Sequence, residues 1–250
     1  MPKLSVLILV KNEAHNVEEC LESVAWADEK VVIDTGSTDG TVEKAKKWTP
    51  KVFETQWQGF AGTKNWGLQR VTGDWVLWLD ADERVTPELA AEIQQVLSAP
   101  QKDGYEMPRK ANFLGHWILH GGWYPGYVLR LVRREQAHFE ESRVHEGLKR
   151  PPRVGRLKNP LLHYTDPTLE HYLTKFNRYT TLAAEDLRER GRRFHLRDLL
   201  FRPLHLFLKM YIFKAGFLDG FPGFLLAQLS AFYVFTKYAK LFEWQVKDAK

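Results

Sequence analysis

Hydrophobic residues gather in short unbroken runs through the first hundred residues, and polar residues separate the runs. Apolar runs of this length, bounded by charged and turn residues, predict strands buried on both faces of a sheet. We expect such strands at residues 4–10, 30–34, 52–55 and 75–79. Helical patterns fill the intervals at about 16–26, 41–48 and 63–71, and another helix begins with Thr86 as N-cap and Pro87 at its first position. This alternation predicts an α/β fold with a Rossmann-like, mostly parallel sheet flanked by helices.

The pattern changes after residue 100. Short β-like runs follow at 104–108, 127–132 and 161–164, and a glycine-rich aromatic loop lies between the first two at 121–126. After Pro167 the sequence predicts a long helix over 169–190 and then two strongly apolar stretches at 199–217 and 221–242. The chain therefore divides into a regular α/β half, a looser middle and a helical extension.

Acidic residues follow the fourth predicted strand directly, at Asp80 and Asp82. Ligands of open α/β sheets bind at the carboxyl edge of the strands. Residues that leave strands one, two and four should meet there, and the polar ones are Asn12, Glu13, Asp34, Asp80 and Asp82. Four carboxylates in one cleft require a hard divalent cation.

Neither standard phosphate-binding loop is present, since there is no G-x-G-x-x-G and residues 59–64 do not form a Walker A motif. Phosphate binding would then depend on a metal ion and basic side chains. This argues against a kinase, a P-loop ATPase and a nicotinamide dehydrogenase.

Charge is distributed unevenly along the 250 residues. The first hundred contain 10 Lys and Arg against 16 Asp and Glu, whereas residues 101–250 contain 26 against 15. The basic part needs an anionic neighbour, which could be nucleic acid, a phosphorylated substrate or a membrane surface. A single cysteine, Cys20, excludes a disulfide framework and a cysteine-rich zinc site.

Four separated motifs in the first hundred residues resemble family-2 glycosyltransferases with the GT-A fold. They are residues 31–34 with 36–41, Lys64-Asn65, Gly73-Asp74, and 79–83. The resemblance implies that Asp34 contacts the uracil or ribose of a UDP-sugar donor. It also implies that Asp80 and Asp82 hold the ribose and a Mg²⁺ or Mn²⁺ ion on the diphosphate. Asn12, Glu13 and Lys64 are expected at the same donor site, although Lys64 stands where Arg is common and Thr35 where a second Asp is common.

Two residues of the middle region are candidates for the chemistry. Inverting transfer needs a carboxylate that takes the proton of the acceptor hydroxyl, and Glu146 is our candidate base, with a surface salt bridge to Arg143 or Lys149 as the alternative. The resemblance implies a histidine that completes the metal shell near the end of the catalytic domain. His163 stands at that place, and the alternative is a core histidine. His145 could orient Glu146 or bind an acceptor phosphate.

The apolar tail predicts membrane association. Residues 220–236 carry no charge, but a span needs about 20 residues, so an interfacial position is favoured over a crossing. Basic side chains would then face lipid head groups, namely Arg202, Lys209, Lys214, Lys237 and Lys240. The alternative is two helices packed on the catalytic domain or on a second subunit.

The tail also resembles the ending of bacterial lipopolysaccharide core glycosyltransferases, through residues 214–220 and 235–241. This implies glucose transfer from UDP-glucose to a heptose of the inner core, by a peripheral protein at the cytoplasmic face of the inner membrane. We therefore expect a nucleotide-sugar-binding half at 1–100, an acceptor and catalytic half at 101–167 and a membrane-associating region at 168–250.

The sequence is compatible with two other functions. One is transfer to a polyprenyl phosphate or another saccharide acceptor, since one donor site serves many acceptors. The other is a nucleic-acid- or membrane-binding module without catalysis. The basic residues of 188–240 are interleaved with long apolar runs rather than stacking positions, so no nucleic-acid partner is expected.

Overall fold

The computed structural model describes residues 1–140 and 147–248 and divides the chain into two compact units. Unit 1 comprises Met1–Arg109 and Tyr127–His163, and unit 2 comprises Lys110–Gly126 and Tyr164–Lys250. The two units share the strands β6 (Gly104–Phe113) and β12 (Leu161–Asp166), which begin in unit 1 and continue into unit 2. The predicted division by function into 1–100, 101–167 and 168–250 remains a prediction.

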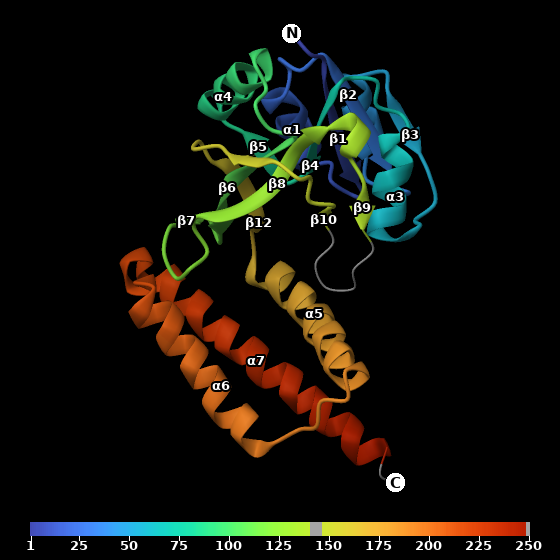
Figure 1. Cartoon of the computed structure of the whole chain (residues 1–250). Helices are drawn as coiled ribbons and strands as arrows, with labels where there is room; N and C mark the ends of the chain where they lie inside the picture. Colours follow the sequence, from blue (N-terminus) through green and yellow to red (C-terminus); the bar gives the residue numbers. More distant parts are fainter. Residues whose placement is uncertain (141–146, 249–250) are drawn as a thin grey trace. The chain divides into compact units, whose positions relative to one another are not determined.

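Unit 1 contains a mixed sheet with helices on both sides (Figure 1). The strand order β3-β2-β1-β4-β8-β6-β12-β5 begins with parallel neighbours, and β8 then runs antiparallel to β4. The predicted α/β class and the mostly parallel first half of the sheet are therefore confirmed. The strands are β1 (Leu4–Val10), β2 (Glu29–Asp34), β3 (Val52–Glu54), β4 (Trp75–Asp80), β5 (Glu83–Val85), β8 (Gly126–Arg133), β9 (Phe139–Glu140), β10 (Gly147–Leu148) and β11 (Val154–Arg156).

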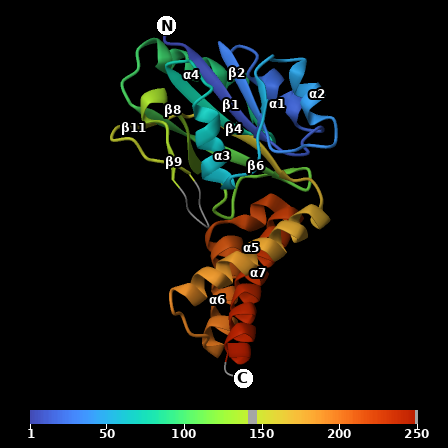
Figure 2. The same ribbon diagram turned by 90° about the vertical axis from the view of Figure 1, so that its right-hand side faces the viewer.

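The two faces of the parallel strands bury different helices, because successive side chains of a strand point to opposite faces. Ile8 faces a core made with α1 (Val17–Ser23), α2 (Thr41–Lys46) and α4 (Pro87–Ser98). Its neighbour Leu7 faces α3 (Gly59–Leu68) and the β9–β10 hairpin (Figure 2). Both faces are covered, which explains why the sequence shows continuous apolar runs rather than alternation.

Helix α3 begins at Gly59, four residues before the start that the sequence suggested. Thr63 lies inside the helix, where its hydroxyl donates to the Gly59 carbonyl at 2.7 Å and accepts from the Gln58 amide at 3.1 Å. Threonine favours helix starts because its hydroxyl can bond free backbone groups. Here Thr63 lies beyond the first turn of a helix that begins at Gly59, so its hydroxyl does not mark the helix start.

We expect Gly73→Ala to destabilise unit 1 by about 1–3 kcal/mol, the usual cost of forcing extra volume into a packed site. A Cβ at Gly73 would lie 2.7 Å from Ser5 Oγ and 2.8 Å from the Lys3 carbonyl oxygen, and the backbone atom cannot rotate away. Urea unfolding measures the change. Gly147→Ala is the matched control, since a Cβ there meets nothing within 4 Å; equal stability of the two variants would contradict the prediction.

Unit 2 combines a short hairpin with three helices. Strand β7 (His116–Ile118) pairs with the end of β6, and the helices are α5 (Leu169–Glu189), α6 (Leu196–Leu208) and α7 (Gly220–Asp248). A π-helical turn at Lys209–Phe213 and a 3₁₀ turn at Gly216–Asp219 connect α6 to α7. Both α5 and α6 lie against α7 (Figure 1). Within the described residues, one helical segment, Gly216–Lys247, is long and apolar enough to cross a membrane by length and composition.

Candidate active site

The strand register brings the predicted acidic residues to one edge of the sheet. Asp34 lies opposite Val10 at the end of β2, and Asp80 lies opposite Leu9 at the end of β4. Asp82 follows in the turn before β5. Residues far apart in the chain therefore meet beyond the carboxyl ends of β1, β2 and β4, as the topology of a parallel sheet requires.

An ion network that includes Arg130 of β8 supports this acidic edge. The Arg130 side chain is 3% exposed, and its Nη2 donates to Asp80 Oδ2 at 2.8 Å and to Glu83 Oε1 at 2.5 Å. Glu83 is fully buried, and its other oxygen accepts from the Asp80 amide at 3.0 Å. Arg109 Nη1 lies 3.8 Å from Glu83 Oε1. The buried carboxylate and guanidinium thus hold both the backbone and one side-chain oxygen of Asp80.

The charges of the network change the acidity of the two carboxyl groups in opposite directions. Burial raises the pKa of Glu83 above its ordinary value despite the charge of Arg130. Loss of solvent would also raise the pKa of Asp80, but the positive charges of Arg130 and Lys64 outweigh it and lower the pKa of Asp80 to about 2. Asp80 is therefore ionised at neutral pH, and its side chain remains 39% exposed and accessible to a ligand.

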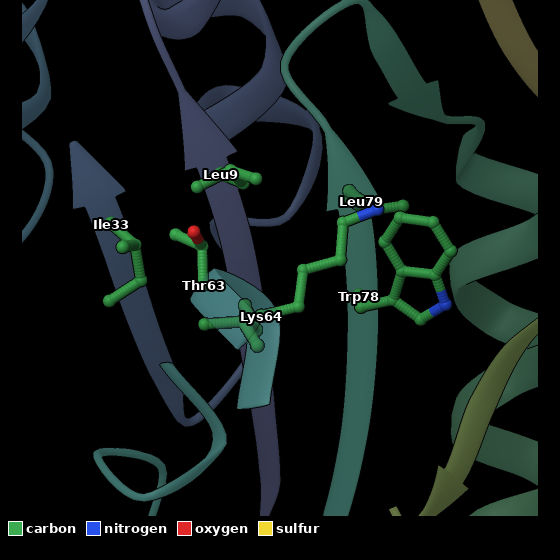
Figure 3. Close-up of a pocket in the computed structure, with 7 residues that line it drawn as sticks. Leu9, Ile33, Thr63, Lys64, Trp78 and Leu79 are labelled. Carbon is green, nitrogen blue, oxygen red and sulfur yellow. The ribbon is translucent and has the colours of Figure 1, made fainter. Parts of the chain in front are cut away.

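Lys64 of α3 approaches the same edge along the face of Trp78 (Figure 3). Its Nζ lies 3.9 Å from the centroid of the Trp78 ring, and the guanidinium carbon of Arg130 lies 3.4 Å from the same centroid. The Trp78 ring itself is fixed by a hydrogen bond from Nε1 to the Leu129 carbonyl at 3.1 Å. Cations over an aromatic face are attracted to it, so Trp78 holds two positive charges beside Asp80.

Asp34 shapes the turn that follows β2. Its carboxylate accepts from the Gly36 amide at 2.9 Å and from the Ser37 amide and hydroxyl, and Gly36 has a φ of +94° that favours glycine. Asp34 is 2% exposed, so its carboxylate is buried in the turn that it shapes. The nucleotide contact predicted for Asp34 remains a prediction.

Asn12 and Glu13 connect the ends of β1 and β2. Asn12 has a φ of +56°, which Asn tolerates, and its Oδ1 accepts from the Thr38 amide at 2.8 Å. The Glu13 amide donates to Thr41 Oγ1 at 2.8 Å. Both residues therefore lie beside the turn that Asp34 shapes, at the predicted edge.

Asp82 and His163 form the pair that could hold a divalent cation. Pairing of β12 with β5 places His163 opposite Glu83, and His163 Nε2 lies 3.3 Å from Asp82 Oδ2. Two ligands on adjacent corners of an octahedron with bonds of about 2.1 Å are about 3 Å apart, so the spacing fits a shared ion. No group of three or more His, Cys, Asp or Glu side chains with metal-ligand geometry occurs among the described residues. Mg²⁺ or Mn²⁺ would take Asp82 as a carboxylate ligand and complete its shell with water and substrate phosphate, and His163 would add a nitrogen ligand that is less usual for Mg²⁺.

The candidate base Glu146 lies outside the described residues, together with Arg143 and His145. The two ends of this segment are fixed by the β9–β10 hairpin, in which Glu140 pairs with Gly147. Asn65 of α3 attaches the hairpin to unit 1, since its side chain accepts from the Phe139 amide at 2.8 Å and donates to the Phe139 carbonyl at 2.9 Å. Asn65 thus contacts the hairpin, and its neighbour Lys64 lies over Trp78 beside the acidic edge.

The sequence interpretation missed Arg130. It stands alone among Val128, Leu129, Leu131 and Val132 in a run that was recognised only as a strand. A charge in a buried strand requires a partner, because an unpaired buried charge is very costly. That signal was present, but its partners could not be identified before the pairing of β4 with β8 was known.

Comparison with known proteins gives full-length relatives. The chain is 31% identical to the lipopolysaccharide core biosynthesis glycosyltransferase LpsC of Rhizobium meliloti, with 100% of this chain and 96% of LpsC covered. It is 30% identical to an uncharacterised glycosyltransferase of Rickettsia felis, with 99% of this chain and 92% of that protein covered.

A solved structure shares the fold. The mannosyltransferase PcManGT of Pyrobaculum calidifontis, in complex with GDP-mannose and Mn²⁺, superposes with a TM-score of 0.59 at 16% identity, covering 96% of this chain and 87% of that one. The sequence model of glycosyl transferase family 2 matches residues 5–143, which include nearly all of β1, the strands β2 to β4, the acidic edge and Arg130. On this match and the full-length relatives, the protein is a member of glycosyl transferase family 2.

Proposed function

We propose that this protein is a divalent-cation-dependent, inverting hexosyltransferase that moves glucose from UDP-glucose onto a heptose of the lipopolysaccharide inner core. The observation that carries the proposal is the pair Asp82–His163 beside the Asp80–Arg130 ion pair, at the carboxyl edge of the sheet. Support for the acceptor comes from LpsC, a full-length relative whose name assigns it to lipopolysaccharide core biosynthesis. The PcManGT complex, with GDP-mannose and Mn²⁺, supports a nucleotide-sugar donor and a cation.

In the proposed reaction the acceptor hydroxyl oxygen attacks C1 of the donor sugar, and the bond from C1 to the diphosphate oxygen breaks on the opposite face. Glu146 takes the hydroxyl proton, and UDP leaves with the electron pair of the broken bond. A cation bound by Asp82 and His163 would supply charge stabilisation for the departing diphosphate. Asp80, held by Arg130, would orient the ribose, and Lys64 would add positive charge close to the diphosphate.

The predicted place of the reaction is the cytoplasmic face of the inner membrane, where the protein would act peripherally on a lipid-linked acceptor. The apolar helix α7 and the excess of basic residues after residue 100 support this location.

Donor and acceptor are tested together with purified protein. UDP-glucose, UDP-galactose and UDP-N-acetylglucosamine are compared in thermal shift with Mn²⁺ or Mg²⁺, and UDP-glucose should give the largest stabilisation. Radiolabelled donor is then offered with core-truncated lipopolysaccharide and, separately, with polyprenyl phosphate. Label in the lipopolysaccharide supports the proposal. Label only in polyprenyl phosphate would show that the proposed acceptor is wrong and would leave the proposed donor site unchanged.

Glu146→Gln is expected to lower transfer by about 10²–10⁴-fold, the range for loss of a general base, and to leave UDP binding unchanged. Glu140→Gln tests the alternative base, because Glu140 is exposed and pairs with Gly147 in the β9–β10 hairpin. Steady-state transfer and UDP titration separate the two effects. Loss of transfer in Glu140→Gln, with normal transfer in Glu146→Gln, would assign the base to Glu140.

A further inference from the structure

Helix α6 of unit 2 exposes its apolar side to the surroundings. Five large side chains on this side are between 39% and 67% exposed, at spacings of three and four residues that place them on one face of a helix. We name them the α6 face, and they are Leu196, Leu200, Phe201, Leu204 and Leu208. A helix of a water-soluble protein normally shows the opposite orientation, with its apolar stripe toward the core.

The inward side of α6 carries a carboxylate. The Asp198 side chain is 4% exposed, accepting from Arg192 Nη2 at 2.9 Å and from Arg202 Nε at 2.6 Å. The inward side also carries Leu206 and Phe207, which pack on the core of unit 2, so α6 has apolar residues on both its inward and its outward side. This arrangement suits a surrounding medium that is itself apolar.

The α6 face continues into the connection between α6 and α7. Ile212, Phe213, Phe217, Leu218 and Phe221 are between 48% and 79% exposed there, and we name them the 212–221 corner. Such a cluster of exposed aromatic and aliphatic side chains marks an interaction surface.

Backbone contacts fix this corner. The Asp219 carboxylate accepts from the His120 amide at 2.8 Å, lies 2.8 Å from His120 Nδ1, and also accepts from the Leu119 amide. Gly223 packs so closely on Gly216 that a Cβ would lie 2.0 Å from the Gly216 carbonyl oxygen. The motif at residues 214–220 therefore builds a fixed turn, and the exposed side chains are held outward by packed structure.

The charges around this surface have one sign. Residues 191–240 contain eight Lys and Arg and two acids, Asp198 and Asp219. The side chains of both acids are at most 6% exposed, whereas basic side chains such as Arg197, Lys209 and Lys214 are exposed. The groove between α6 and α7, of 320 Å³, also places Arg202 and Lys237 beside Phe201 and Tyr238. An apolar face with cations at its margin is complementary to an anionic lipid surface.

Helix α7 is tied to a polar helix, which opposes a crossing of the bilayer. Phe232 of α7 stacks on Phe176 of α5 with ring centroids 5.5 Å apart, and Lys240 Nζ donates to the Asn177 carbonyl at 2.9 Å and to Thr181 Oγ1 at 2.7 Å. Insertion of α7 would either break these contacts or carry the charged side chains of α5 into hydrocarbon, and both are costly.

We propose that unit 2 lies in the interface of an anionic membrane through the α6 face and the 212–221 corner, with α7 packed on α5 and α6 and not spanning the bilayer. This rests on the membrane location given under the proposed function and specifies the surface that makes it. The occupant of the surface is phospholipid, whose acyl region covers the apolar side chains and whose phosphates meet the cations.

The test uses the full-length protein and vesicles of phosphatidylethanolamine with or without phosphatidylglycerol. Binding by flotation should require phosphatidylglycerol and weaken at high salt, because exposed charges are screened. Phe213→Ser and Phe221→Ser should each reduce the partition coefficient about tenfold, as expected for a buried phenylalanine. Leu173→Ser is the control, since Leu173 is 43% exposed but lies on α5. Equal loss in the control, or no loss in the double variant Phe213→Ser with Phe221→Ser, would overturn the proposal.

A second measurement locates the corner directly. Cys20 is the single cysteine and is fully buried, so Phe213→Cys provides the one accessible thiol for an environment-sensitive fluorophore. Its emission should shift to the blue on anionic vesicles, and the Leu173→Cys label should not respond. A shift that depends on protein concentration without lipid would show a second copy on this face and overturn the proposal. Resistance of the protein to carbonate extraction would show that α7 spans the bilayer, and this result would also overturn the proposal.

Transfer measured with a detergent-dispersed acceptor separates this proposal from the proposed function. The serine variants should retain that activity, because the changed side chains lie in unit 2 and outside the donor site. Wild-type protein that binds vesicles but transfers no sugar from UDP-glucose would refute the proposed donor and acceptor and leave the proposed membrane surface unaffected.

Discussion

Asp82→Ala should abolish sugar transfer, with a loss of at least about 100-fold, while the protein remains folded. The expected size follows from removing the carboxylate of the cation that stabilises a leaving diphosphate, a contribution of several kcal/mol. The Asp82 side chain lies in a turn and is 21% exposed. Its removal therefore leaves no buried charge unpaired, and the variant should fold. Transfer and UDP hydrolysis are measured over a range of Mn²⁺ concentrations, with circular dichroism to verify the fold.

Two comparisons make the Asp82 result specific. Glu135→Ala removes an exposed carboxylate elsewhere in unit 1 and should leave transfer unchanged. His163→Ala should raise the Mn²⁺ concentration needed for half-maximal activity, because it removes the second ligand of the pair. Near-normal turnover of folded Asp82→Ala would show that the acidic edge does not hold the reactive diphosphate, and the assigned role of the edge would be withdrawn.

Arg130→Met should lower the free energy of unfolding by about 3–5 kcal/mol, the usual cost of leaving a buried charge without its partner. Glu83 would lose its 2.5 Å contact, and Asp80 would lose the guanidinium that lowers its pKa. Urea unfolding at neutral pH measures the loss. Arg130→Lys keeps the charge but cannot contact both carboxylates with the same planar geometry, so an intermediate value is expected.

A second change separates stability from positioning. In Arg130→Met with Glu83→Gln the uncompensated buried charge is removed, so much of the stability should return. Transfer should stay low and the KM for the donor high, because Asp80 remains without the group that holds it. Full recovery of the donor KM in the double variant would show that Arg130 serves stability alone.

These expectations assign different tasks to neighbouring acids. Glu83 is buried and serves Arg130, Asp80 is fixed by Arg130 yet accessible, and Asp82 faces His163. A sequence of three acids within four residues would otherwise suggest three equivalent metal ligands. Their different burial and partners produce the difference in role.

Local features of the fold could be predicted from the sequence because short-range physics determines them. The apolar run of β4 ends at Asp80 as expected, and Thr86 caps α4 by accepting from the Leu89 amide at 3.1 Å. The meeting of strand ends followed from the rule that parallel strands share an edge. The position of the acidic edge could therefore be predicted from the sequence, whereas its role in donor binding stays a prediction.

The contacts of Asp80 and Asp82 with other side chains depend on the pairing of strands that are distant in the sequence. Arg130 reaches Asp80 because β8 runs antiparallel to β4, and His163 reaches Asp82 because β12 pairs with β5. The outward orientation of the leucines on α6 could not be predicted either. An apolar stripe in a sequence is the same whether a protein core or a membrane covers it. The sequence alone determined the strands, the family motifs and the acidic edge. Only the tertiary structure decided which charges neutralise that edge and which apolar face stays open, because antiparallel register and helix packing depend on contacts between distant residues.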